Sequence, residues 1–322
     1  MSSITIALAQ MNCTVGDLTG NSAQILAQMR RAQSLGADLL LTPELSLCGY
    51  PPEDLLLRDG FLQDCRNALD AIAAQVHEMV VVVGFPELGR DGKRYNAAAV
   101  LQNGRVILTA RKHDLPNYDV FDEKRYFSAW HEPCVLELKG VRFGLTICED
   151  VWWPEAPAMA KASGAQVILS INASPYHKEK QAARHAVFRE WIRATHLPMV
   201  YVNMVGGQVE LVFDGASCVL DAQGEVTQQA PFFEASLTLV VFDGAVPRPG
   251  VCAPSLPLAA EVYQALVTGT RDYVLKNGFS GVLIGLSGGV DSALTLAIAC
   301  DALGADKVRA VMMPSQFTAQ MS

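Results

Sequence analysis

Short apolar runs alternate with helical patterns along most of this chain. From Ile4 to about Asp243, runs typical of β-strands are separated by segments in which apolar residues repeat with the helical period. Hairpins are predicted at Gln102-Asn103-Gly104 and around Gly140. The predicted strands are Ile4–Ala9, Asp38–Thr42, Val80–Gly84, Ala97–Leu101, Val106–Ala110, Arg142–Ile147, Val167–Ile171, Met199–Val205 and Ser217–Leu220, and the predicted helices are Asn21–Ser34, Leu62–His77, Glu155–Ser163 and Glu179–Thr195. The pattern indicates a mixed α/β domain over residues 1–245.

A proline-rich stretch then divides the chain. Residues 246–258 include Val246-Pro247-Arg248-Pro249-Gly250, which we expect to sustain neither helix nor sheet, and therefore to form a linker. A second domain over residues 259–322 is predicted to contain the helices Ala259–Asn277 and Ala293–Leu303 and the strands Val282–Ile284 and Val308–Met312. Two strands cannot close a doubly wound sheet, so we expect this domain to be incomplete in the 322 residues.

Composition narrows the class of protein. The net charge is −8 and there is no cluster of Lys and Arg, which argues against nucleic acid as a partner and favours small molecules. The N-terminal segment has no basic region before its apolar run, and no apolar run approaches the length of a membrane span. The eight cysteines are scattered without metal-site spacing, which indicates reduced thiols and a cytoplasmic location.

The strongest local signal lies in the second domain. The run Gly285, Leu286, Ser287, Gly288, Gly289, Val290, Asp291, Ser292 joins a predicted strand to a predicted helix. Glycines allow the backbone to aim its N–H groups at an anion, the helix N-terminus adds a positive dipole, and the serines add hydroxyl donors. A valine at position 289 would fill the space that the anion needs and would exclude a positive φ. The run is neither a Walker A loop nor a GxGxxG motif, and we interpret it as an ATP phosphate site.

Three reactive side chains follow predicted strands in the first domain. Glu44, Lys112 and Cys148 each come directly after an apolar run, where α/β folds place active sites. Acyl transfer from an amide needs a nucleophile, a proton shuttle and a group that stabilises the oxyanion, and Cys, Glu and Lys can supply these three. A cation beside Cys148 would also favour its thiolate. Each residue taken alone has an ordinary structural explanation, and only their combination indicates catalysis.

The surrounding strings resemble known families. The loop SGGVDS is similar to the PP-loop of the N-type ATP pyrophosphatases, and the first domain resembles the nitrilase superfamily, in particular the glutaminase domain of the glutamine-dependent NAD synthetase family. That family carries both domains in this order, and its Ser/Thr-rich segment after the second strand resembles residues 313–322. The segments that carry the nitrilase resemblance are Pro43–Leu55, Lys112–Glu123 and Ile147–Trp153.

The resemblance implies a fold and a set of roles. The fold would be a nitrilase-like αββα sandwich followed by the start of a Rossmann-like PP-loop domain. Glu44 would be the general base, Lys112 the oxyanion stabiliser and Cys148 the nucleophile. Tyr118, Ser174 and Lys180 would hold glutamine. Physically, Lys180 could pair with the α-carboxylate.

The implied enzyme is a carbon–nitrogen ligase of NAD biosynthesis, a glutamine-hydrolysing NAD synthase. It would hydrolyse glutamine through a Cys thioester and use the ammonia for ATP-dependent amidation of deamido-NAD to NAD, with release of AMP and pyrophosphate. Mg²⁺ would offset the phosphate charge, with Asp291 as a possible ligand, and the protein would be a homo-oligomer.

Alternatives remain open at this stage. A Cys-His mechanism would use His113, but its position next to Lys112 in an extended segment predicts that the two side chains point to opposite faces. Trp152 and Trp153 are interpreted as packing and pocket wall. A stand-alone nitrilase-superfamily amidase with a vestigial nucleotide-binding segment, and a non-catalytic nucleotide-binding subunit, are the competing functions. The second of these is disfavoured by the intact Glu44, Lys112 and Cys148.

Overall fold

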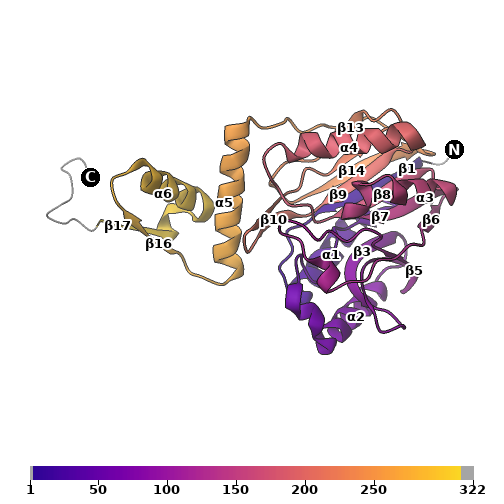
Figure 1. Cartoon of the computed structure of the whole chain (residues 1–322), viewed down its shortest axis with the longest axis horizontal. Coiled ribbons are helices and arrows are strands. Elements are labelled where there is room, and N and C mark those ends of the chain that lie inside the picture. Colours follow the sequence, from indigo (N-terminus) through magenta and orange to yellow (C-terminus); the bar gives the residue numbers. More distant parts are fainter. Residues whose placement is uncertain (1–2, 313–322) are drawn as a thin grey trace.

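A computed structural model describes residues 3–312 of the chain. It shows two parts, a large two-sheet domain and a smaller unit that contains the C-terminal helices (Figure 1). The segment 313–322, which was interpreted as the Ser/Thr-rich segment of the family, lies outside the described residues. No helix within residues 3–312 has the length and apolar character needed to cross a membrane.

The first sheet of the large domain has seven strands. Its central strands β1, β2 and β3 are parallel, and β5 runs in the same direction because β4 reverses the chain between β3 and β5. The carboxyl ends of β2 and β5 therefore lie at the same edge of the sheet. The strands in spatial order are β15 (Val246–Pro247), β14 (Ser236–Asp243), β1 (Ser3–Gln10), β2 (Leu39–Leu41), β3 (Val80–Leu88), β4 (Arg94–Gln102) and β5 (Arg105–Arg111).

The second sheet has six strands, and its centre is again parallel, since β7, β8 and β9 run together. The strands in spatial order are β13 (Val226–Gln229), β12 (Cys218–Leu220), β9 (Met199–Asn203), β8 (Val167–Asn172), β7 (Val141–Ile147) and β6 (Cys134–Leu138). Between β9 and β12 the chain forms a separate ribbon of β10 (Val205–Gln208) and β11 (Leu211–Asp214).

The two sheets pack face to face, and alternation along β1 shows how. Ile4, Ile6 and Leu8 point into the core between the sheets, while Ala7 and Ala9 face the helices on the other side. Helices α1 (Leu18–Ser34) and α2 (Asp59–Ala73) cover the first sheet, and α3 (Glu155–Ala162) and α4 (Lys180–Thr195) cover the second. The predicted αββα sandwich is confirmed.

The smaller unit begins with the long helix α5 (Leu258–Lys276), which contacts the β10–β11 ribbon on one side and α6 (Val290–Leu303) on the other (Figure 1). Strands β16 (Val282–Leu286) and β17 (Val308–Met312) pair in parallel, and α6 connects them as expected for a Rossmann-like unit. Four short 3₁₀ helices complete the described chain: η1 (Glu53–Leu57), η2 (Glu123–Arg125), η3 (Cys148–Val151) and η4 (Ala305–Lys307).

The structure corrects one expectation about the proline-rich stretch. Val246 and Pro247 form β15, which pairs with the end of β14, and Cys252 makes a bridge to Gln229. Proline is tolerated here because β15 is the edge strand, where a missing N–H breaks no bond to a further strand. The expectation that residues 246–258 sustain no sheet was therefore wrong at these positions.

Candidate active site

The three predicted catalytic residues each follow the end of a strand. Glu44 comes three residues after β2, Lys112 directly follows β5, and Cys148 directly follows β7. Because β2 and β5 end at the same edge of one sheet and β7 belongs to the other, the site forms where the two packed sheets meet. All three side chains are buried.

Lys112 lies at the centre of this cluster. Its Nζ donates to Oε1 of Glu44 at 2.7 Å and to Oε1 of Glu123 at 2.8 Å. Burial alone would lower the pKa of Lys112, but the carboxylates of Glu123 and Glu44 outweigh burial and hold that pKa well above its ordinary value. The ammonium group therefore stays charged, as an oxyanion stabiliser must.

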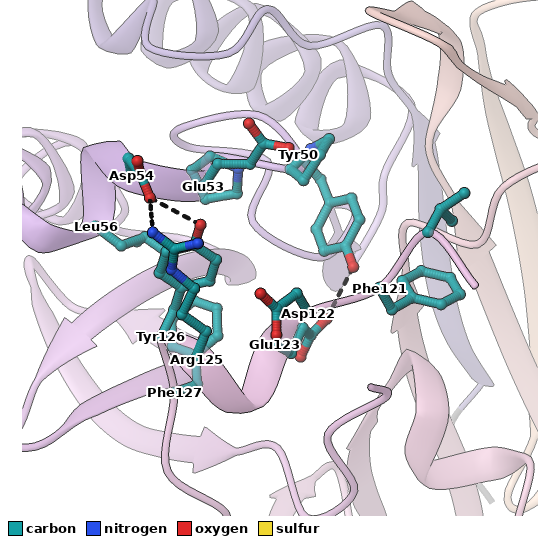
Figure 2. A pocket seen from close by; sticks show the side chains of 13 residues that line it. Tyr50, Glu53, Asp54, Leu56, Phe121, Asp122, Glu123, Arg125, Tyr126 and Phe127 are labelled. Carbon is teal, nitrogen blue, oxygen red and sulfur yellow. Dashed lines mark hydrogen bonds and ion pairs between the residues drawn. The ribbon is translucent and has the colours of Figure 1, made fainter. Parts of the chain in front are cut away.

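Glu123 was not assigned a role from the sequence. It begins η2, and its Oε1 also accepts from the Tyr50 hydroxyl at 2.9 Å (Figure 2). Burial raises the pKa of Glu123 to about 7 although Lys112 opposes the shift. A cavity of about 300 Å³ adjoins this carboxylate and is lined by Tyr50, Phe121 and Arg125 among others. Glu123 ends one of the segments that carry the nitrilase resemblance, but only the fold shows that its side chain contacts Lys112.

Glu44 is fixed on both oxygens. Oε1 accepts from Asn96 Nδ2 at 2.7 Å in addition to Lys112, and Oε2 accepts from the backbone N–H of Ala173 at 2.9 Å. Asn96 belongs to β4 and Ala173 follows β8, so residues of both sheets hold the same carboxylate. The orientation of Glu44 is therefore set before any substrate arrives.

Cys148 occupies a strained turn. Its φ is 49°, in the left-handed region that residues other than glycine seldom adopt, and its side chain is 5% exposed. Burial and the charge of Glu44 raise the pKa of the thiol well above its ordinary value, and Lys112 only partly opposes this. The expected effect of a nearby cation is present, since Lys112 lowers the pKa of the thiol, but burial and the charge of Glu44 outweigh it. The thiol must give up its proton during attack, which requires a base.

Tyr118 and Glu149 form a second group beside Cys148. The Tyr118 hydroxyl donates to Glu149 at 3.0 Å, and Trp153 Nε1 donates to Glu149 Oε1 at 3.2 Å. These three residues line a cavity of about 640 Å³ together with His113 and Phe127. Glu149 directly follows Cys148 within the segment Ile147–Trp153, and it was assigned no role in the site from the sequence.

Ser174 and Lys180 lie on the second sheet's side of the site. Ser174 is buried, and its carbonyl and hydroxyl accept from Arg184 Nη2 at 2.9 and 3.2 Å. Arg184 in turn forms a buried ion pair with Asp214, at 2.7 Å between Nη1 and Oδ2. Lys180 is the first residue of α4, and its Nζ lies 4.2 Å from the centre of the Trp152 ring.

The pKa of Lys180 depends on the charged and titratable groups around it. Burial and the neighbouring Arg184 lower the pKa of Lys180, whereas Cys148 and Glu149 act in the opposite direction. An anionic ligand beside Lys180 would raise the pKa of its ammonium group again and so stabilise its charged form. Trp152 and Trp153 are thus a wall of the site, as interpreted from the sequence, and each also contacts one of its charged residues.

His113 makes contacts away from Lys112. Its Nδ1 lies 2.9 Å from Asp114 Oδ2, and its ring packs edge-on against His131 at 4.8 Å between centroids. The neighbouring Lys112 side chain points instead to Glu44 and Glu123.

The phosphate loop lies on the smaller unit, between β16 and α6. Ser287 and Ser292 are linked across it, at 3.1 Å between hydroxyl oxygens, and the Ser287 N–H donates to Ser292 Oγ at 3.3 Å. The residues from Ser287 to Asp291 are exposed. Gly285 and Leu286 end β16, while Val290 opens α6, so the first N–H groups of the helix face outward from the loop.

One detail of this loop differs from the expectation. The positive φ belongs to Gly288, at 83°, whereas Gly289 has a φ of −81°. A Cβ at position 289 would meet only Ser287 Oγ, at 3.6 Å. A valine there would therefore occupy the space above the loop without straining the backbone.

A magnesium site has one candidate ligand in this region. Asp291 is exposed on the first turn of α6, and no group of three or more His, Cys, Asp or Glu suited to a metal occurs within residues 3–312. Mg²⁺ bound with nucleotides usually takes one or two carboxylates plus phosphate oxygens, so a single carboxylate beside a phosphate loop fits.

The sandwich fold and the buried cluster of Glu44, Lys112 and Cys148 together define the class of protein. The family model described as "Carbon-nitrogen hydrolase" matches residues 5–246, and the chain belongs to that family. The model described as "NAD synthase" matches residues 262–322. Glutamine-dependent NAD(+) synthetase from Acinetobacter baylyi is 46% identical over 324 residues, which cover 100% of this chain and 60% of the relative. The resemblance inferred from the motifs is thus confirmed.

Solved structures agree with this assignment. Glutamine-dependent NAD+ synthetase from Acinetobacter baumannii in complex with adenosine diphosphate has a TM-score of 0.96 at 45% identity, over 99% of this chain and 61% of that one. A mutant of the amidase from Nesterenkonia sp. AN1, with the acetamide moiety of fluoroacetamide added covalently at its active site cysteine, has a TM-score of 0.65 at 27% identity, over 76% of this chain and 90% of that one. The chain spans about 60% of the length of the curated relatives it matches.

Proposed function

We propose that the gene product containing this chain is a glutamine-hydrolysing NAD synthetase, a carbon–nitrogen ligase with glutamine as amido-nitrogen donor. The observation that carries the proposal is the buried Lys112–Glu44 pair, 2.7 Å apart, beside Cys148 in a chain that also holds a phosphate loop. The match of residues 262–322 to the NAD synthase model favours this function over a stand-alone amidase.

Hydrolysis would proceed through Cys148. Its Sγ attacks the carboxamide carbon of glutamine while Glu44 takes the thiol proton, and Lys112 stabilises the oxyanion. Glu44 then returns the proton to the amide nitrogen, and ammonia leaves as the thioester forms. Water, activated by Glu44, releases glutamate and restores the thiol. The raised pKa of Cys148 supports this order, since the proton is lost only as the bond forms.

Glutamine would be selected by charges on both sides of Cys148. Lys180 is placed to meet the α-carboxylate, because burial and Arg184 lower the pKa of its ammonium group and an anionic ligand would oppose both effects. Glu149, held by Tyr118 and Trp153, can meet the α-ammonium group. Ser174 contributes its buried hydroxyl and is fixed by Arg184. A simple amide lacks both charged groups and would gain neither contact.

The second half would take place at the loop from Gly285 to Ser292. Backbone N–H groups at the start of α6 and the hydroxyls of Ser287 and Ser292 would bind the phosphates of ATP. Ammonia would replace AMP on the adenylated carboxylate of deamido-NAD and give NAD, with pyrophosphate released earlier. Asp291 would hold Mg²⁺, which offsets phosphate charge when bound.

The domain limits follow from the same proposal. We place the glutaminase domain at 1–245, the linker at 246–258 and the synthetase region from 259 onward, which agrees in outline with the family matches. The eight free thiols support a cytoplasmic location. The homo-oligomer stays a prediction, which sedimentation of the gene product can check.

Covalent labelling tests the nucleophile. A diazoketone analogue of L-glutamine should add one acyl-methylene group to the protein and lose N₂, and peptide mapping should place the adduct on Cys148. The Cys148→Ala variant should take up no label. Cys134→Ala is the matched control, since Cys134 is more accessible than Cys148, and its labelling should be unchanged. An adduct on another cysteine would contradict the assignment.

A further inference from the structure

The buried carboxylate of Asp150 connects the loop that contains Cys148 to the loop that contains Lys112. Asp150 lies two residues after Cys148 in η3, and its side chain is 3% exposed. Its Oδ2 accepts from the N–H of Ile147 at 2.8 Å. Its Oδ1 accepts from the N–H groups of His113 and Asp114, both at 2.9 Å. The donors are thus the residue before Cys148 and the two residues after Lys112.

These contacts join two different sheets. Lys112 follows β5 of the seven-stranded sheet, whereas Cys148 follows β7 of the six-stranded sheet. Apolar side-chain packing between the sheets has no preferred direction, so it sets the separation of the sheets only loosely. Three directional hydrogen bonds to one carboxylate fix the two loops more narrowly, because N–H donors weaken steeply away from the acceptor axis.

The bond to Ile147 also acts on the strained turn. Cys148 adopts a φ of 49°, and such conformations persist only where the surroundings hold them in place. By accepting from the N–H of Ile147, the residue before Cys148, the Asp150 side chain stabilises this turn. A carboxylate that served only as a turn cap would bond its own segment, but this one bonds the Lys112 loop twice as well.

We propose that Asp150 is a positioning residue for glutamine hydrolysis, which sets the placement of the Cys148 thiol relative to the Lys112 ammonium. This inference rests on the proposed function. Asp150 contacts backbone N–H groups and takes no part in proton transfer. It acts through the geometry of attack, for which a misplacement of about 1 Å can cost on the order of a hundredfold in rate.

Asp150→Asn is the first test, measured in the full gene product. The amide keeps the shape of the carboxylate but turns an NH₂ group toward at least one N–H donor, so one of the two loops loses its anchor. We expect kcat for glutamine hydrolysis to fall by at least ~tenfold while KM changes by less than about threefold. Ammonia-dependent NAD formation should stay within about twofold of wild type, and the near-unchanged KM for glutamine shows that the first domain is folded.

Asp221→Asn is the matched control. Asp221 also accepts two backbone N–H groups, from Gln223 and Glu225, but in the exposed turn between β12 and β13. It should leave kcat unchanged. Asp150→Ser, which puts no amide donor in the site, provides a second variant and should show the same loss of kcat.

The outcomes separate the two claims. Wild-type kcat in either folded Asp150 variant overturns the inference. Loss of ammonia-dependent NAD formation in both variants would assign Asp150 to the fold and would equally overturn it. If the wild-type gene product hydrolyses no glutamine, the proposed function itself fails.

Discussion

Lys112 is held between two buried carboxylates, with Glu44 at 2.7 Å and Glu123 at 2.8 Å from the same nitrogen. One cation thus compensates two acids that would otherwise repel each other within the protein interior. This arrangement keeps the ammonium charged and aims it at the place where Cys148 would generate an oxyanion. It also links catalysis to stability, because removing Lys112 would leave two buried carboxylates without a cation.

The first prediction separates the contribution of Lys112 to catalysis from its contribution to stability. Lys112→Met should lower glutaminase kcat by about a hundredfold or more, the scale of losing an oxyanion donor. It should also destabilise the first domain by about 3–5 kcal/mol, the usual cost of breaking a buried ion pair. Adding Glu123→Gln should recover part of the melting temperature and none of the activity. Steady-state kinetics and calorimetry check both expectations.

His113→Ala serves as the neighbouring control for that experiment. The His113 ring contacts Asp114 and His131, so its loss should cost far less kcat than the loss of Lys112. The opposite order of effects would favour a Cys-His mechanism.

The second prediction concerns pH. Burial raises the pKa of Glu123 from 4.5 to about 7, so the folded state binds this proton more tightly than the unfolded state does. Between these two values the folded protein holds more protons, and the contribution of Glu123 to stability therefore falls as pH rises. Glu123→Gln removes that contribution.

Melting temperatures at pH 5 to 8 give the measurement. The difference, Glu123→Gln minus wild type, should increase as pH rises through the window from 4.5 to about 7. Glu137→Gln, at an exposed glutamate of β6, controls for the loss of a carboxylate. A difference that falls with pH would mean that Glu123 is ionised more easily in the folded protein.

The third prediction addresses the phosphate loop. Gly289→Val should abolish ATP binding, because the added side chain fills the space above the loop where phosphate would lie. Its backbone conformation suits any residue, so the fold should be unaffected. Basal glutamine hydrolysis should persist. Isothermal titration with ATP is the measurement, and Gly60→Val, at another exposed glycine with open space around it, is the control. Unchanged ATP affinity would make the loop structural.

Sequence periodicity predicted the main strands and helices well, because both sheets are built from apolar runs with clear turn signals. Strand β14 was missed as a separate element, since it has no reverse turn to mark its start, and its pairing partner β1 lies over two hundred residues earlier. The edge strand β15 was missed because its proline pointed to a linker.

Some residues of the site could likewise be predicted from the sequence, and others could not. Glu44, Lys112 and Cys148 could be found because each ends an apolar run within a family motif. Glu123 could not, since it lies among the four consecutive charged residues from Asp122 to Arg125 and only the fold turns it toward Lys112. The influence of a cation on the thiol could be predicted, but the burial that outweighs this influence could not, because a sequence does not show the extent of burial. The charges near a residue can be inferred from a motif, whereas the extent of its desolvation can be judged only from the packed structure.

We propose that one gene product contains two separate sites, with Cys148 serving only the release of ammonia. The most direct measurement is NAD formation by the Cys148→Ala variant with either glutamine or ammonium as nitrogen donor. Glutamine-dependent formation should be abolished while ammonium-dependent formation stays close to wild type, because Cys148 and the loop from Gly285 to Ser292 lie on different domains. Equal loss with both donors, or retained activity with glutamine, would contradict it.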